Sequence, residues 1–119
     1  FTPVTGVITQ GYSPSESHFA VDISVPEKTP IKAVSDGTVI LAEWTTETGY
    51  VVIIKHEQNL ISVYKHNESL AVNQGDLVIS GEVIGFAGST GVLSTGPHLH
   101  FELWSDGYPI NPTELIEFE

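Results

Sequence analysis

The sequence predicts an all-β domain, an antiparallel β-sandwich or partly closed barrel with a duplicated β-motif. Apolar, β-branched runs alternate with turn residues along the whole chain, which is typical of antiparallel strands. These runs cover residues 5–12, 18–24, 30–44, 49–66, 76–88 and 97–110. Helical periodicity is nearly absent, and only residues 111–118 could form a turn of helix. Antiparallel strands that share one buried face pack as a sandwich or a barrel.

Short turn sequences connect the predicted strands. EQN at 57–59 predicts a tight hairpin between VVIIK and LISVY, and SDG at 105–107 predicts another. AVSDGTVI at 33–40 and AVNQGDLVI at 71–79 share an Ala-Val pair, a glycine turn and a β-branched run. This echo favours a duplicated motif within one domain.

Composition excludes several classes of function. The chain has 119 residues, of which 40% are hydrophobic, so it can build one domain with a substantial core. Fifteen acidic residues against four lysines give a formal net charge of −11, which argues against binding to nucleic acid or an anionic membrane. Cysteine is absent, so any metal must be bound by His, Asp or Glu.

The ends of the sequence bear on its origin. No apolar run is long enough to cross a membrane, and no export signal is present. We therefore expect no membrane insertion by this domain. Separately, we expect the domain to be a monomer. Because the chain opens at Phe1 without a methionine, we expect residues 1–119 to be a single domain excised from a longer precursor.

Histidines and one aspartate form the candidate site. His98 and His100 share one face of a predicted strand, which aims two imidazoles at one place. His18 and Asp22 are four residues apart, an even spacing that puts both on one face of an extended segment. With one histidine of the later pair, they make three protein ligands, the pattern of a catalytic zinc site that keeps a fourth position for water. The spacing leaves open whether His98 or His100 is the ligand.

Hydrolysis by zinc requires further groups near the ion. Zinc lowers the pKa of a water molecule toward neutrality, a base must take the proton, and a donor must stabilise the oxyanion or protonate the leaving amine. The remaining histidine of the 98–100 pair and His66 suit these roles, since an imidazole titrates near neutral pH.

Three motifs occur in a fixed order: H-x-x-x-D at 18–22, Y-x-H at 64–66 and GPHLHFE at 96–102. Together they resemble the lysostaphin-like, LytM-type zinc metallopeptidases, which cut peptidoglycan peptides. The likeness covers nearly the whole chain, because TPIKAVSDGTVI, GDLVISGEVIGFAGSTG and the closing NP are also similar to that family's turns. The resemblance implies a metallopeptidase catalytic domain with one Zn²⁺. It implies that the zinc ligands are His18, Asp22 and His100, and that the catalytic pair is His66 and His98.

Four other residues near these motifs need an interpretation. The family usually has glycine where this chain has Ala20, and an ordinary backbone angle accommodates the extra methyl group. Tyr12 is a candidate substrate-binding residue, with a half-buried packing role as the alternative. Glu102 shares the face of the histidines and is either a partner that fixes a histidine tautomer or a solvated charge. His56 is excluded from the site, because it ends a strand before a hairpin, where an exposed polar residue is expected.

The resemblance predicts a zinc-dependent endopeptidase acting on peptidoglycan peptides outside the cytoplasm. GPHLHFELW resembles relatives from Gram-negative bacteria more than the enzymes that cut polyglycine, and a chain of charge −11 would be repelled by walls rich in teichoic acid. We therefore expect action in the periplasm or cell envelope, on D-alanyl-diaminopimelate cross-links rather than glycine bridges.

Three other functions are alternatives to this interpretation. A non-catalytic or autoinhibited cell-wall regulatory module of the same fold is the first, although no ligand position is missing here. A phosphohistidine carrier would use His18 but would leave Asp22, His66 and the H-x-H motif without a joint purpose. A lipoyl or biotinyl carrier is discarded, because none of the four lysines has the required flanking sequence.

Overall fold

The computed structural model describes residues 1–89 and 96–118, which form ten strands and two short 3-10 turns. The strands are β1 (Val7–Gln10), β2 (Val21–Ser24), β3 (Pro30–Lys32), β4 (Gly37–Thr45), β5 (Gly49–Lys55), β6 (Leu60–Leu70), β7 (Leu77–Val78), β8 (Val83–Ala87), β9 (His98–Ser105) and β10 (Tyr108–Ile110). The 3-10 turns are η1 (Pro14–Glu16) and η2 (Pro112–Glu114). Each of the six predicted runs contains a strand, and η2 is the turn of helix predicted for residues 111–118. Thr90 and Gly91, which end the glycine-rich stretch quoted above, lie outside the described residues.

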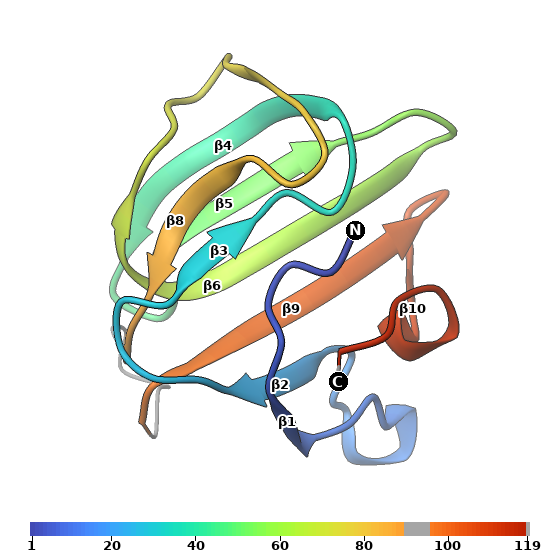
Figure 1. The fold of residues 1–119 in the computed structure, drawn as a ribbon. Coiled ribbons are helices and arrows are strands. Elements are labelled where there is room, and N and C mark those ends of the chain that lie inside the picture. Colours follow the sequence, from blue (N-terminus) through green and yellow to red (C-terminus); the bar gives the residue numbers. More distant parts are fainter. Residues whose placement is uncertain (90–95, 119) are drawn as a thin grey trace.

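All strand pairs are antiparallel, and the main path through the sheet is β1-β2-β9-β6-β5-β4-β7. The long strand β6 pairs with β9 and β5 over most of its length and with β8 at its end. Strand β8 also pairs with β3. Together these two strands form a small second layer across one face of β5 and β6 (Figure 1). The predicted all-β antiparallel class is confirmed, and the path is an open sheet rather than a closed barrel.

The core lies between the two layers. Ile31 and Ile84 come from the small layer and meet Ile54, Tyr64 and Phe101 from the main sheet, and all five are fully buried. Along β9 the buried side chains alternate with half-buried polar ones, as expected for a strand with one apolar face. Core packing therefore holds β9 in place and presents its polar face on the other side of the sheet.

Positive backbone angles explain both predicted hairpins. Gln58 and Asn59 have φ of 60° and 57° between β5 and β6, and Asp106 and Gly107 have φ of 51° and 85° between β9 and β10. Two consecutive positive φ values give a turn whose twist matches antiparallel strands. Asn, Asp and Gly tolerate this conformation best, so the hairpin signals in the sequence have a direct physical cause.

The two similar stretches at 33–40 and 71–79 meet in space. Each runs from a turn into a strand, and β4 and β7 pair there, with Gly37 opposite Val78 and Thr38 opposite Leu77. The strands differ in length, because β4 has nine residues and β7 has two.

His56 is buried, so its predicted exposure is wrong. Its Nδ1–H donates to the carbonyl of Asp36 at 2.8 Å, which leaves Nε2 to accept from the Ser62 hydroxyl at 2.7 Å. Ser62 is in turn 2.8 Å from the Tyr64 hydroxyl, which accepts from the backbone N–H of Val34 at 3.2 Å. Burial raises the pKa of Tyr64 to about 12, against the opposing hydrogen bonds from Ser62 and Val34. This buried chain of hydrogen bonds gives His56 a structural role.

Replacing Tyr64 by phenylalanine should destabilise the fold. The substitution keeps the ring in the core but leaves the Val34 N–H and the Ser62 hydroxyl without this partner. We expect a loss of about 1–3 kcal/mol in the free energy of unfolding, measured by urea denaturation. Tyr108→Phe is the control, since Tyr108 is 75% exposed and its hydroxyl has water available. Equal losses in the two variants would contradict a role for the buried chain.

Candidate metal centre

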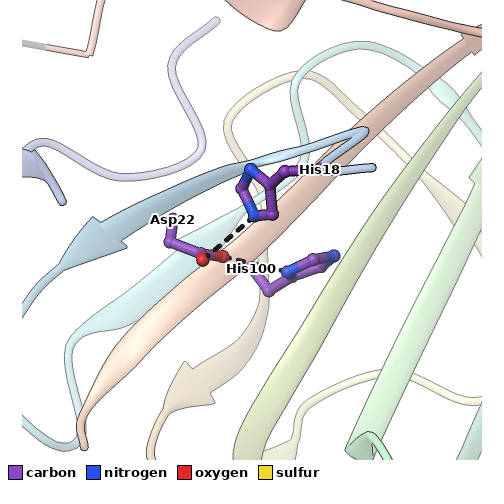
Figure 2. Close-up of side chains that lie close together, drawn as sticks. All are labelled: His18, Asp22 and His100. Carbon is purple, nitrogen blue, oxygen red and sulfur yellow. Dashed lines mark hydrogen bonds and ion pairs between the residues drawn. The ribbon is translucent and has the colours of Figure 1, made fainter. Parts of the chain in front are cut away.

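The pairing of β2 with β9 builds the centre of the site. Asp22 on β2 lies directly opposite His100 on β9, and the preceding pair, Val21 with Phe101, lies in the core. Asp22 Oδ1 is 2.9 Å from His100 Nδ1, and Asp22 Oδ2 is 3.2 Å from His18 Nε2. One ligand atom from each of these three residues lies within 4.8 Å of the others. Figure 2 shows the three side chains turned toward one another.

His18 reaches the cluster from outside the regular strand. Strand β2 begins at Val21, and His18 lies between η1 and this strand. His18 forms an isolated antiparallel β-bridge with Ser13, which lies just before η1. The Nδ1–H of His18 donates to the carbonyl of Gly11 at 2.7 Å, so Nε2 is the nitrogen that faces Asp22. Ala20, between the two, is buried and does not have a positive φ, so its methyl group is accommodated without backbone strain.

His66 and His98 lie beside the cluster. Their ring centroids are 5.0 Å apart, and the His66 ring is 5.9 Å from that of His100. His66 has a φ of 68° at a point where the register of β6 shifts. In a regular strand its side chain would share the core face with Tyr64, and the irregular backbone places it near the other histidines instead. His98 donates from Nδ1–H to the carbonyl of Gly96 at 2.7 Å.

An open pocket of about 290 Å³ is lined by all five predicted metal and catalytic residues. A second hollow of about 430 Å³ adjoins it, since Gln10, Asp22 and His98 line both. Four further residues line the pocket that sequence reasoning missed, because no motif around them indicates chemistry; these are Gln10, Glu47, Thr48 and Lys65.

The Tyr12 side chain is half-buried and contacts Pro109 and Phe19 rather than the pocket. Its hydroxyl donates to the carbonyl of Pro109 at 3.1 Å, and its ring meets that of Phe19 edge-on at 6.2 Å. Tyr12 is not among the residues that line either hollow, and a substrate-binding role for it stays a prediction.

Opposing effects set the charges of Asp22 and His100. Burial raises the pKa of Asp22, but the hydrogen bond from His100 and the nearby imidazoles outweigh it, so the pKa lies below its ordinary value. Burial lowers the pKa of His100, but Asp22 and Glu102 outweigh it, so the net shift is upward. Without a metal, these contacts therefore favour an ionised Asp22 and a His100 imidazole that holds a proton more readily than a free one.

Glu102 is the group on the other side of His100. Its Oε2 is 2.8 Å from both His100 Nε2 and Lys65 Nζ, and its Oε1 accepts from Trp104 Nε1–H at 2.9 Å. Burial raises the pKa of this carboxyl, but these three hydrogen bonds reverse the shift and bring the pKa to about 2. Of the two interpretations of Glu102, the solvated charge is wrong, because the carboxylate is fully engaged with neighbouring side chains.

The Glu102 carboxylate should stabilise the metal-free protein in a defined pH range. Its pKa falls from 4.5 to about 2 on folding, so the contribution is complete above pH 4.5 and is lost as the pH falls toward 2. We expect the stability difference between wild type and Glu102→Gln to shrink over that range in denaturant titrations with a chelator present. A difference independent of pH would contradict this.

Comparison with known families places most of the chain in one peptidase family. The model of peptidase family M23 matches residues 16–112, a range that contains His18, Asp22, His66, His98 and His100. A crystal structure of a zinc containing peptidase from Vibrio cholerae has a TM-score of 0.86 and 32% sequence identity, over 92% of this chain and 37% of that one.

Two curated relatives indicate the range of functions. DD-carboxypeptidase/endopeptidase Mpg of Neisseria meningitidis is 40% identical over 98 residues, which are 82% of this chain and 22% of that protein. Murein hydrolase activator EnvC of Escherichia coli is 39% identical over 90 residues, which are 76% of this chain and 21% of that protein. The chain spans about a quarter of the length of the curated relatives it matches. With the family model matched across the whole site and the fold shared, this chain belongs to peptidase family M23, as its resemblance to the lysostaphin-like enzymes predicts.

Proposed function

We propose that residues 1–119 form a zinc-dependent endopeptidase domain that hydrolyses peptide cross-links of bacterial peptidoglycan outside the cytoplasm. One observation carries the proposal: His18, Asp22 and His100 converge inside a pocket whose wall also contains His66 and His98. The similarity to a DD-carboxypeptidase/endopeptidase supports the class of substrate.

The converging residues fit a zinc ion by their chemistry. Two imidazoles and one carboxylate are common zinc ligands, and three protein ligands leave a position for water or substrate. A zinc ion held there would polarise a peptide carbonyl and lower the pKa of a water molecule. The hydrogen bond from His18 Nδ1–H to Gly11 supports this use of the ring, because it leaves Nε2 without a proton in the neutral form.

His66 and His98 would manage protons and the oxyanion charge. With Nδ1–H of His98 bonded to the Gly96 carbonyl, its Nε2 is the nitrogen that can take up a proton. The 5.0 Å between the two rings allows both to reach one peptide group in the pocket. One imidazole then acts as the base, and the other donates to the developing oxyanion or the leaving amine.

Charge supports a preference among cross-links. The net charge of −11 disfavours approach to a wall rich in teichoic acid, so D-alanyl-diaminopimelate cross-links are preferred over glycine bridges in this proposal. The adjoining hollow, lined in part by Thr9, Gln10 and Ser24, gives an extended peptide room on one side of the cluster.

The similarity to a murein hydrolase activator favours one alternative, a regulatory domain of the same fold. Such a domain could keep the metal cluster and still cleave nothing. Binding of zinc without cleavage of either type of cross-link would support this alternative over the peptidase.

Removal of one ligand should abolish zinc binding and activity together. We expect one zinc per chain in the wild type, and chelator-sensitive release of cross-linked muropeptides. Asp22→Ala and His100→Ala should lose the metal and at least about a hundredfold in activity, because two ligands cannot hold zinc as three do. Metal analysis and chromatography of the products measure both effects. Full activity in a metal-free Asp22→Ala protein would refute the mechanism.

Substitution of either catalytic histidine should separate the two effects. His98→Ala and His66→Ala should keep one zinc per chain and lose about a hundred- to ten-thousandfold in kcat/KM, as for the loss of a general acid or base. His56→Gln is the matched control, since His56 lies in a structural chain of hydrogen bonds away from the pocket. Loss of cleavage in folded, zinc-loaded His56→Gln would show that the choice of histidines is wrong.

A further inference from the structure

We propose that Glu102 is a positioning residue for the metal centre, which holds His100 with Nε2 protonated and Nδ1 directed at the metal. This inference rests on the proposed zinc site and adds a function for a residue outside the ligand set. It follows from three contacts of one carboxylate, with His100, Lys65 and Trp104.

The two histidines of the cluster are held in the same way. His18 faces Asp22 with Nε2 and binds the Gly11 carbonyl with Nδ1–H. His100 faces Asp22 with Nδ1 and contacts Glu102 with Nε2, at 2.8 Å. In each ring, one nitrogen points into the cluster, and the other meets an acceptor that cannot donate a proton. An outer acceptor of this kind fixes the tautomer and the orientation of a metal-binding histidine.

Glu102 is itself fixed by two further donors. The Lys65 ammonium is 2.8 Å from Oε2, and the Trp104 indole N–H is 2.9 Å from Oε1. Lys65 lies on β6 directly opposite His100, and Trp104 follows Glu102 by two residues on the same face of β9. Because only 12% of the Glu102 side chain is exposed, the carboxylate holds one position rather than moving in solvent.

The contacts require a carboxylate rather than an amide at this position. His100, Lys65 and Trp104 all present hydrogen-bond donors, and only an ionised carboxylate accepts through both oxygens. Glutamine could still accept from His100 and Lys65 through its carbonyl oxygen, but its NH₂ group would then face the Trp104 N–H. Alanine would leave His100 Nε2 without this partner.

The first test is the protonation of His100 in the zinc-loaded protein. Nitrogen NMR that detects couplings within the imidazole ring should show the proton on Nε2 in the wild type. In Glu102→Ala we expect a change in the His100 ring signals, because the acceptor that fixes the tautomer is gone. A zinc-loaded wild type with the proton on Nδ1 would overturn the proposal.

The second test is zinc affinity, measured by competition with a chromophoric chelator. Glu102→Ala should raise the zinc dissociation constant by about 10- to 100-fold, as for loss of other outer partners of metal ligands. Glu102→Gln should recover part of that loss, because its carbonyl can still accept from His100. Glu43→Gln is the matched control for the loss of one negative charge, since Glu43 is exposed on β4 and is not part of the pocket wall. We expect no change in its zinc affinity.

These measurements separate the possible failures. If the wild type binds no zinc, both the proposed function and this inference are overturned. If the wild type binds zinc and Glu102→Ala binds it equally well, only the inference fails. A loss of zinc affinity in Glu102→Ala that Glu102→Gln does not recover at all would also overturn it, since His100 would then not depend on the acceptor. Circular dichroism of each metal-free variant verifies that the protein compared is folded.

Discussion

The register between β2 and β9 is the constraint on which the site depends. Val21 and Phe101 are paired in the core, so the next pair along, Asp22 and His100, must lie on the opposite face. A slip of one residue would pair Asp22 with an apolar residue of β9 and leave the carboxylate and the imidazole on opposite faces of the sheet. The same apolar contacts that stabilise the sheet therefore set the strand positions of two metal-binding groups.

Charge compensation makes this polar face stable before a metal arrives. Asp22 and Glu102 flank His100, and Lys65 supplies a further positive charge beside Glu102. Hydrogen bonds from the His100 imidazole to both carboxylates satisfy polar groups that would otherwise be costly to bury. The His100 imidazole lies between the two carboxylates and the Lys65 ammonium lies beside Glu102, so the acidic groups of the site have hydrogen-bond partners in the folded protein.

The sequence predicted those features that depend on local rules. Strand alternation places His98 and His100 together, and residues that favour positive φ mark both hairpins. The contribution of Lys65 could not be predicted, because it depends on which strand pairs with β9 and in which register. His56 was misplaced for the same reason: its burial comes from Ser62 and Asp36, which approach it only in the folded chain. Contacts that depend on pairing between distant strands could therefore not be predicted from the sequence.

His66 shows how both layers determine the chemistry at one point. A left-handed backbone is unfavourable for any residue with a Cβ, by about 1–2 kcal/mol, so the surrounding structure must impose it. Its N–H donates to the carbonyl of Thr48 in the β4–β5 turn at 2.8 Å, and its carbonyl accepts from Gly88 N–H, just past β8, at 3.2 Å. These bonds tie β6 to the hairpin and to the end of the small layer. The second layer therefore completes the core and also helps hold a histidine out of the regular alternation, where its ring can meet those of His98 and His100.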